Sequence, residues 1–251
     1  DKEKVKVGNF LKHNALTFFP YEFPGEYNAA NVEICADADG DKYVLFQGKR
    51  MYAKRGWTDD HIRGYFNFLT IEQDTRSPHC YFTNKERRPS EQDIVADIGV
   101  AEGNFSLSII DHVKKIYLFE GDPDWLYSIR KTFAPWKDKV EIVPKFVGDC
   151  DNENETRLDS FFKDKQLDYI KADVEGAEPR LLKGGEETFS GKVKKVLLCA
   201  YHRKEHEGLI RNCLRSHNFE IAVNKGYMIF LLDKLSYPYI RRGVIYGRKS
   251  G

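Results

Sequence analysis

A stretch near the middle of the chain constrains the fold more than any other. Residues 94–98 read Ile-Val-Ala-Asp-Ile, an apolar and largely β-branched run that predicts a buried strand. Residues 99–103, Gly-Val-Ala-Glu-Gly, predict a tight turn, and residues 104–110 predict a helix. A strand, a glycine turn and a helix in this order are typical of α/β folds that bind nucleotide-like ligands.

The composition of the turn suits a ligand cradle. Small residues at Gly99, Ala101 and Gly103 let the backbone approach a ligand, because a larger side chain would occupy that space. Asp97 lies at the end of the strand and can accept a hydrogen bond from the same ligand. The helix that begins near Asn104 turns its free N–H groups toward this point. The alternative is a closely packed turn in which Asp97 only caps the helix.

The spacing of the glycines indicates which ligand the cradle suits. A dinucleotide fingerprint reads G-x-G-x-x-G, whereas here Gly99 and Gly103 are separated by three residues and follow an acidic one. Glu102 lies inside the turn, where it would repel a pyrophosphate. A ligand without phosphates is therefore favoured. S-adenosylmethionine fits, because its sulfonium and amino groups are cationic and its ribose hydroxyls can bind a carboxylate.

Strands and helices alternate over the rest of the chain. Glu120 follows the second strand, 23 residues after Asp97, close to the spacing of about 20 at which nucleotide folds place a ribose-binding acid. Asp149 follows the third strand, where it can meet an adenine amino group or simply form a turn. The last two strands predict a closing hairpin. The predicted strands are 94–98, 115–119, 140–147, 167–172, 196–200, 219–223 and 227–231.

A second group of candidate residues follows two later strands. Asp173, Glu175 and Glu178 come directly after residues 167–172, and His202 follows the next strand. In open α/β sheets ligands bind at the carboxyl ends of the strands, so we expect these side chains to meet there. His206 lies four residues after His202, but without an H-E-x-x-H pattern a zinc site is weakly supported. We expect His206 on the surface.

Residues 1–90 have a different pattern. Three short strands within 32–53, separated by Gly-containing turns, predict a β-meander, and 58–69 predict an amphipathic helix. The polar segment 71–81 precedes the cradle and is either a lid over the ligand or a solvated connection between domains. We therefore predict an N-terminal extension followed by a ligand-binding domain over residues 91–251.

Composition argues against several function classes. The net charge is +1, which does not favour nucleic acid or an anionic membrane as a partner. The five cysteines have no C-x-x-C spacing and indicate free thiols in a reducing compartment, so we expect a cytoplasmic protein. No apolar stretch has transmembrane length, and residues 1–4 do not resemble a signal peptide, although a trimmed N-terminus stays open. Arg241 and Arg242 are expected in a solvated tail.

Taken together, these segments resemble the FkbM family of S-adenosylmethionine-dependent methyltransferases, over about residues 90–232. The resemblance is carried by residues 95–106, Phe119-Glu120, Leu158-Asp159, 168–178 and Leu182-Lys183-Gly184, of which the K-x-D-V-E-G-A-E block is the most characteristic. It implies an α/β fold with a mostly parallel, Rossmann-like class I methyltransferase sheet, a terminal antiparallel hairpin and an N-terminal α+β extension. One departure lies in the cradle, which commonly reads G-A-N-x-G but here reads G-V-A-E-G.

The resemblance also implies a reaction, O-methylation of a sugar, glycan or natural-product hydroxyl. Such a hydroxyl is a poor acid, so a base or a metal must take its proton. His202, Asp173 and Glu175 are the catalytic candidates, with His202 the best base because imidazole titrates near neutrality. Asp173 and Glu175 can instead hold a divalent cation, which is not favoured because no third ligand is evident. The expected cofactor-binding residues are Asp97, Gly99, Ala101, Glu102, Gly103, Asn104, Phe105, Glu120, Gly121, Asp149 and Asp173.

Three other functions are weighed at this point. The main alternative is a non-catalytic module that binds S-adenosylmethionine and docks a partner in a glycan-assembly complex. A nicotinamide oxidoreductase ranks lower because of the glycine spacing, and a nucleic-acid methyltransferase because no Asn-Pro-Pro-Tyr-type motif is present. The expected partner is a small-molecule or saccharide acceptor, without nucleic acid and without membrane insertion. The sequence specifies neither the acceptor nor the oligomeric state.

Overall fold

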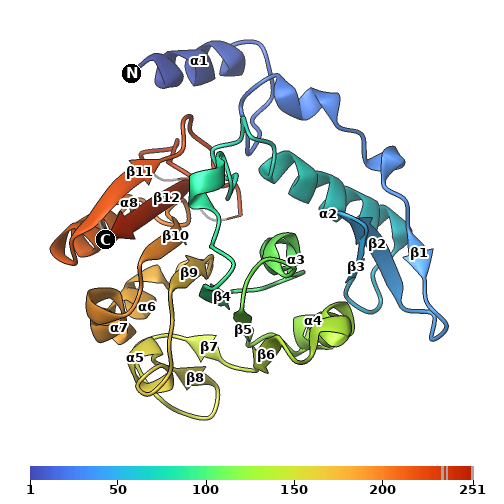
Figure 1. Cartoon of the computed structure of the whole chain (residues 1–251). Helices are drawn as coiled ribbons and strands as arrows, with labels where there is room; N and C mark the ends of the chain where they lie inside the picture. Colours follow the sequence, from blue (N-terminus) through green and yellow to red (C-terminus); the bar gives the residue numbers. More distant parts are fainter. Residues whose placement is uncertain (233–234, 236, 250–251) are drawn as a thin grey trace.

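The computed structural model describes residues 1–232, 235 and 237–249. Within these residues a seven-stranded sheet of order β11-β12-β10-β9-β4-β5-β6 forms the centre (Figure 1). Neighbouring strands pair in parallel, except that β12 is antiparallel to both β10 and β11. The predicted α/β fold with a mostly parallel sheet is confirmed. The strands are β4 (Ile94–Ile98), β5 (Lys115–Phe119), β6 (Val140–Val143), β9 (Tyr169–Ala172), β10 (Lys195–Cys199), β11 (Phe219–Val223) and β12 (Val244–Lys249).

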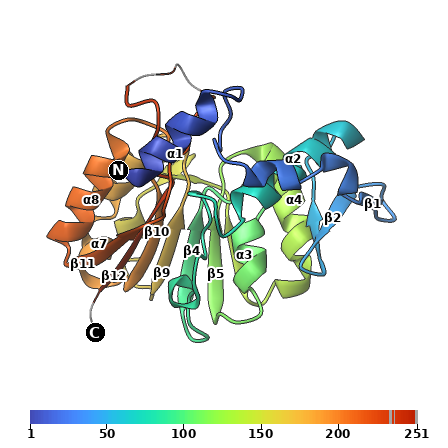
Figure 2. The same ribbon diagram turned by 90° about the horizontal axis from the view of Figure 1, so that it is seen from above.

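The two faces of the sheet have different coverings. Along β4, Ile94, Ala96 and Ile98 face one apolar core and Val95 faces the other, as the two-residue period of a strand requires. The first core is closed by α5 (Leu158–Phe161), α6 (Glu178–Gly184), α7 (Glu186–Gly191) and α8 (His206–Ser216). The second is closed by α3 (Asn104–Ile109) and α4 (Pro123–Phe133). Figure 2 shows the strands side by side with α8 and α7 at one end and α3 and α4 toward the other.

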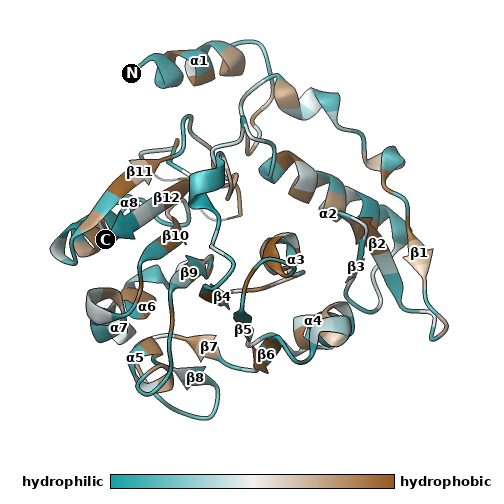
Figure 3. Cartoon of the chain, viewed as in Figure 1, coloured by the Kyte–Doolittle hydropathy of each residue, from teal (hydrophilic) through white to brown (hydrophobic). Residues whose placement is uncertain are grey.

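The N-terminal segment extends this second layer. It contains α1 (Lys2–Leu11), the antiparallel strands β1 (Cys35–Ala36), β2 (Lys42–Phe46) and β3 (Lys49–Tyr52), and the long helix α2 (Asp59–Glu72). The predicted meander and helix are therefore present. Met51, Ile62 and Phe66 belong to the same core as Val95 and Phe105. Figure 3 shows hydrophobic residues concentrated on α3, which lies between the sheet and this segment.

Short irregular elements connect these parts. Within the described residues, the 3-10 turns are η1 (Phe23–Glu26), η2 (Ala29–Asn31), η3 (Lys85–Arg87) and η4 (Ala134–Trp136). The sequence suggested that Phe146 and Val147 continue the strand that begins at Val140. In the structure they do not belong to β6. They form β7 (Phe146–Val147), which pairs with β8 (Glu155–Thr156) in a separate two-stranded sheet. None of the described helices is both long and apolar enough to cross a membrane.

The predicted closing hairpin is wrong in its second strand. β11 pairs with β12, and residues 227–231 contribute only an isolated bridge from Met228 to Arg241. The prediction failed because 227–231 is apolar for another reason: Tyr227, Met228 and Ile229 are buried outside the sheet. β12 was not predicted, because its last two residues are charged, although its first four residues are buried.

Two segments expected to be solvated are buried instead. Arg241 is 8% exposed, and its guanidinium donates hydrogen bonds to the carbonyl oxygens of Tyr201 and His202. Residues 77–81 are also buried, and the carbonyl of Pro78 accepts a hydrogen bond from the Val244 amide. Residues 77–81 are therefore a packed wall rather than a solvated connection, because the C-terminal strand holds them in place.

Candidate active site at the carboxyl end of the sheet

The turn between β4 and α3 is built from glycines that no other residue could replace without strain. Gly99 has a φ of +72°, and a Cβ there would lie 2.0 Å from the carbonyl oxygen of Asp173. Gly103 has a φ of +89°, and its Cβ would meet the Phe133 ring at 2.7 Å. Ala101 also has a positive φ, of 48°, and its amide donates a 3.0 Å hydrogen bond to Glu120. The glycines thus let the turn pass between two strands.

A cleft with two lobes lies over this turn. The lobe next to β5, here called the β5 lobe, has a volume of about 670 Å³. The lobe under α2, here called the α2 lobe, has a volume of about 420 Å³. Gly99, Ala101, Asp173 and Glu175 line both, so the two lobes adjoin each other at these residues. Nine of the predicted site residues line the cleft: Gly99, Ala101, Glu102, Asn104, Glu120, Gly121, Asp173, Glu175 and His202.

Glu120 and Gly121 line the β5 lobe, as predicted. Glu120 is 7% exposed and is fixed by two backbone amides, those of Ala101 at 3.0 Å and Asp122 at 2.8 Å. A Cβ on Gly121 would meet the Phe146 ring at 2.5 Å, so a side chain here would require this ring to move. The lobe therefore combines a fixed carboxylate with an apolar floor that includes Phe119 and Phe146.

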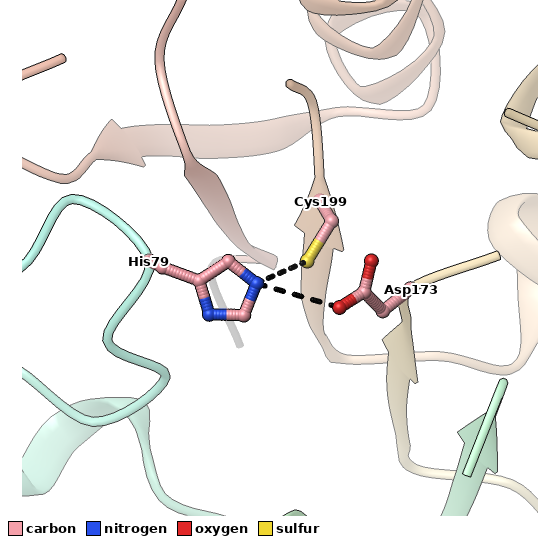
Figure 4. A group of neighbouring side chains, drawn as sticks. All are labelled: His79, Asp173 and Cys199. Atoms are coloured by element: carbon pink, nitrogen blue, oxygen red, sulfur yellow. Dashed lines mark hydrogen bonds and ion pairs between the residues drawn. The ribbon is translucent and has the colours of Figure 1, made fainter. Parts of the chain in front are cut away.

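Asp173 is the most strongly held anion of the cleft. Its carboxylate accepts hydrogen bonds from Tyr201 at 3.1 Å and Tyr81 at 3.3 Å. The Nε2 atoms of His79 and His202 lie 3.4 and 3.3 Å from its two oxygens. Burial alone would raise the pKa of Asp173, but the hydrogen bond from His79 and the positive charge of His202 bring it well below its usual range. Figure 4 shows His79 with the same nitrogen directed at Asp173 and at Cys199, whose Sγ is 3.9 Å away.

His202 lies between two carboxylates. Its Nδ1 is 2.7 Å from Glu178 Oε1, while its Nε2 faces Asp173. Both ring nitrogens of His202 therefore have a carboxylate neighbour. Burial would raise the pKa of Glu178, but hydrogen bonds from His202 and His206 lower it to about 2. His202 thus lies next to Asp173, with Nδ1 hydrogen-bonded to Glu178 and Nε2 beside Asp173, so the carboxylates occupy both sides of the ring.

His206 is not on the surface, contrary to the prediction. It is 2% exposed, and its Nδ1 lies 2.9 Å from Glu178 Oε2. Spacing alone could not show this, because the partner comes from α6. Glu178, His202 and His206 form a buried group that could hold a metal ion, as do His79, Asp173 and Cys199. In the first group, the hydrogen bond between His202 and Glu178 already holds two of the three side chains together without a metal ion.

Glu175 does not join Asp173. It is exposed, adopts a φ of +49° and lines the cleft at its mouth. Among the described residues, the groups that could hold a metal combine Asp173 with His79 and Cys199, and not with Glu175. A divalent cation between these two carboxylates is therefore not supported. The left-handed backbone at Glu175 directs its side chain away from Asp173.

Some predicted cofactor residues have structural partners instead. Asp97 is fully buried, accepts a 2.7 Å hydrogen bond from Ser106 and lies 3.0 Å from Lys171. Phe105 is 1% exposed and stacks on Phe82 and Tyr169. Neither lines the two lobes. Asp97 therefore supports the turn through Ser106 and Lys171, and it does not cap α3, whose N-cap residue is Gly103 with no side-chain hydrogen bond.

The remaining predicted residues are divided between the cleft and the surface. Asn104 and Glu102 line the α2 lobe, where Tyr65 donates a 2.6 Å hydrogen bond to Glu102. Burial raises the pKa of Glu102. Asp149 is outside both lobes, with ion pairs of 2.9 Å to Arg180 and 2.9 Å to Lys183.

Lys171, His79 and Glu72 were not predicted from the sequence. Lys171 is 3% exposed on β9, where its Nζ donates a 2.7 Å hydrogen bond to the Gly99 carbonyl. A lysine within an apolar strand was the signal that could have found it. His79 lies in the segment expected to be solvated, which carried no such signal.

Glu72 is the third residue that was missed. It is the last residue of α2 and lines the α2 lobe. Burial raises its pKa to about 7. The signal was present, because Glu72 continues at helical spacing the apolar series that includes Tyr65 and Leu69. A carboxylate in such a series is directed toward the interior.

Comparisons with known proteins identify related domains. A family model described as "Methyltransferase FkbM domain" matches residues 50–221. The structure of a methyltransferase FkbM from Methylobacillus flagellatus has a TM-score of 0.52 at 20% identity, covering 75% of this chain and 54% of that one. The chain thus spans about half the length of the Methylobacillus protein. This likeness shows the shared class I α/β fold.

Two further structures show weaker likeness. A magnesium protoporphyrin IX methyltransferase from Synechocystis, with bound S-adenosylmethionine, has a TM-score of 0.49 at 13% identity, covering 79% of this chain and 86% of that one. A precorrin-6y C5,15-methyltransferase from Geobacter metallireducens has a TM-score of 0.48 at 15% identity, covering 82% and 97%. No curated protein matches the sequence.

Proposed function

Because the chain belongs to the FkbM methyltransferase family, matched over residues 50–221, we propose that it methylates a hydroxyl of a sugar, glycan or natural product with S-adenosylmethionine. The observation that carries this proposal is the two-lobed cleft. A single turn, with Gly99 and Ala101 at its start, borders both lobes, so two ligands bound there would meet at the turn.

The β5 lobe suits the adenosine part of the methyl donor. Glu120 presents a carboxylate that two amides hold in place, and ribose hydroxyls are good donors to such a group. Gly121 and Phe146 give the lobe an apolar surface on which an adenine ring can lie. The donor supplies an electrophilic methyl group on a sulfonium. Asp173, ionised and common to both lobes, favours that positive charge at the junction.

The α2 lobe suits a ring-shaped acceptor. Its walls include Phe18, Tyr65, Phe68, Tyr81 and Phe230, and aromatic faces of this kind stack on the C–H faces of sugars and on planar rings. Among the aromatic residues of the N-terminal segment, Tyr65 lines the lobe, whereas Tyr52 and Trp57 do not. The chain's contribution is mainly to place the hydroxyl and the methyl group next to each other.

Methyl transfer to a panel of acceptors tests this proposal. The full chain is incubated with methyl-labelled S-adenosylmethionine and with free sugars, methyl glycosides, amino sugars and phenolic natural products. We expect label in one class of acceptor, lost at least tenfold in Glu120→Ala and retained in Asp60→Asn, an exposed carboxylate of α2. Saturable binding of the donor with no labelled product would instead favour the non-catalytic module.

A further inference from the structure

We propose that Glu72 is the group that takes the proton from the acceptor hydroxyl. This inference rests on the proposed methyl transfer and assigns the base for it. Glu72 is placed on the inward side of α2, with Tyr65, Phe68 and Leu69, and these four residues line the α2 lobe together. Their spacing of three and four residues puts them on one face of the helix. The carboxylate of Glu72 therefore faces the space in which the acceptor would lie.

Glu72 also has no competing partner. Within the described chain, no hydrogen bond or ion pair occupies its carboxylate, although the side chain is only partly exposed. The other two inward carboxylates of the lobe are occupied. Asp173 accepts from Tyr81 and Tyr201, and Glu102 accepts from Tyr65. A free acceptor atom that lines a cavity is available to a ligand.

The other titratable groups of the lobe are less available to the acceptor hydroxyl. Asp173 has a pKa well below its usual range, so it holds a proton poorly near neutral pH. Both ring nitrogens of His202 already have carboxylate neighbours, because Nδ1 is 2.7 Å from Glu178 and Nε2 is 3.3 Å from Asp173. Glu175 is exposed at the mouth of the cleft. Three tyrosines of the lobe, Tyr65, Tyr81 and Tyr201, have pKa values raised by burial and stay neutral.

The charges around Glu72 support this assignment. Burial raises its pKa to about 7, with the positive charge of His79 opposing this and the negative charges of Asp173 and Glu102 adding to it. Lys171 acts in the same direction as His79. The other charged groups lining the lobe are Glu175, His202 and Arg203. A carboxylate that titrates near the working pH is ionised often enough to act and basic enough to take a proton.

The step balances as follows. The hydroxyl oxygen of the acceptor forms a bond to the methyl carbon, and the bond between that carbon and sulfur breaks with its electron pair left on sulfur. The hydroxyl proton moves to the ionised Glu72. The products are the methyl ether, S-adenosylhomocysteine and a neutral Glu72, which returns its proton to water.

Kinetics with the acceptor found above tests the assignment. We expect kcat in Glu72→Gln to fall at least 100-fold, on the order of general-base effects, with the dissociation constant for S-adenosylmethionine changed less than threefold. The wild-type kcat/KM should rise with pH toward a plateau above about 7, and this rise should be absent in the variant. Asp60→Asn serves as the matched control on the same helix. A kcat within threefold of wild type in Glu72→Gln would overturn the assignment.

A titration separates failure of this inference from failure of the proposed function. Carboxyl carbons of glutamate are labelled with carbon-13 in the full chain, and Glu72 is identified by the signal lost in Glu72→Gln. A midpoint near 7 supports the inference, and a midpoint near the ordinary value of about 4.3 overturns it. If no acceptor is methylated, the proposed acceptor class fails, and the titration still decides whether Glu72 can act as a base.

Discussion

Single side chains set the charge balance beneath the cleft, and the pair of Asp97 and Lys171 shows this most clearly. Both are almost fully buried, and they lie 3.0 Å apart. Burial would lower the pKa of Lys171, but Asp97 and Asp173 bring it above its ordinary value. The lysine thus stays charged and holds both the carboxylate and the Gly99 carbonyl. Its role is to fix the turn that borders the cleft.

Replacing this lysine should be costly. In Lys171→Met, Asp97 keeps a buried charge without its partner, so we expect unfolding free energy to fall by about 3–5 kcal/mol. Urea denaturation measures this. The double variant with Asp97→Asn should recover part of the loss, because the unpaired charge is removed. Lys194→Met breaks an exposed pair with Asp168 and should cost about 1 kcal/mol or less. Equal losses in the two single variants would contradict the role given to the buried pair.

The raised pKa of Glu72 leads to a second prediction for a single residue, on how the free energy of unfolding depends on pH. Burial raises its folded-state pKa from 4.5 to about 7. The folded protein therefore holds a proton that the unfolded chain releases, and the stability this provides is full below pH 4.5 and lost as pH rises through about 7. Above that pH, Glu72→Gln should be more stable than wild type by about 3 kcal/mol, with little difference at pH 4. Urea titrations at several pH values check this, and a gap independent of pH would contradict it.

Among residues, the sequence predicted best those whose role follows from position on a strand. Glu120, Asp173 and His202 each end or follow a strand, and strand ends meet at one edge. Partners across the fold were not predictable. His206 looked exposed because Glu178, which binds it, lies on another helix, and Asp97 looked free because Lys171 is far away in sequence.

At the scale of elements, the turn between β4 and α3 depends most on its residue types. Gly99→Ala places a Cβ at 2.0 Å from the Asp173 carbonyl in a left-handed conformation. We expect a loss of about 3 kcal/mol or more in unfolding free energy and a weaker affinity for S-adenosylmethionine. Gly208→Ala, within α8 and with nothing near its Cβ, should gain about 0.5–1 kcal/mol. A neutral Gly99→Ala would show that the turn can relax.

Strands were predicted well where an apolar run is buried because it belongs to the central sheet. β4, β5, β9 and β10 were found within one or two residues. The prediction for the C-terminal part was wrong because residues 227–231 are apolar and packed beside the cleft without forming a strand. β12 was missed because two of its six residues, Arg248 and Lys249, are charged. The apolar pattern of a sequence alone does not distinguish a buried strand from a segment that is buried outside the sheet.

At the scale of the whole molecule, the last strand in sequence lies inside the sheet. β12 pairs with β10 on one side and β11 on the other. Ending the chain at Arg242 should therefore remove cooperative unfolding, because both neighbours lose a partner and two cores open. Removing residues 1–11 should leave it intact, since Val7 is the buried residue of α1. Circular dichroism during urea denaturation distinguishes the two, and a cooperative transition in the shorter C-terminal variant would contradict this sheet order.

The N-terminal segment and the sheet domain share one core, so the cleft belongs to both. Tyr65 and Glu72 from α2 face Glu102 and Asp173 from the sheet edge across the α2 lobe. The sequence suggested an extension but not this arrangement, because which faces of two regions meet depends on packing rather than on local pattern. The division at residue 90 stays a prediction.

Calorimetric titration of the full chain with S-adenosylmethionine and S-adenosylhomocysteine tests the central claim most directly. We expect saturable binding of one molecule of either ligand per chain, unchanged by EDTA or added magnesium. Glu120→Ala should weaken both at least tenfold, because a buried carboxylate that accepts ribose hydroxyls is lost. Saturable binding that Glu120→Ala leaves unchanged would place the ligand elsewhere. No saturable heat with either ligand would contradict the claim that this cleft binds the methyl donor.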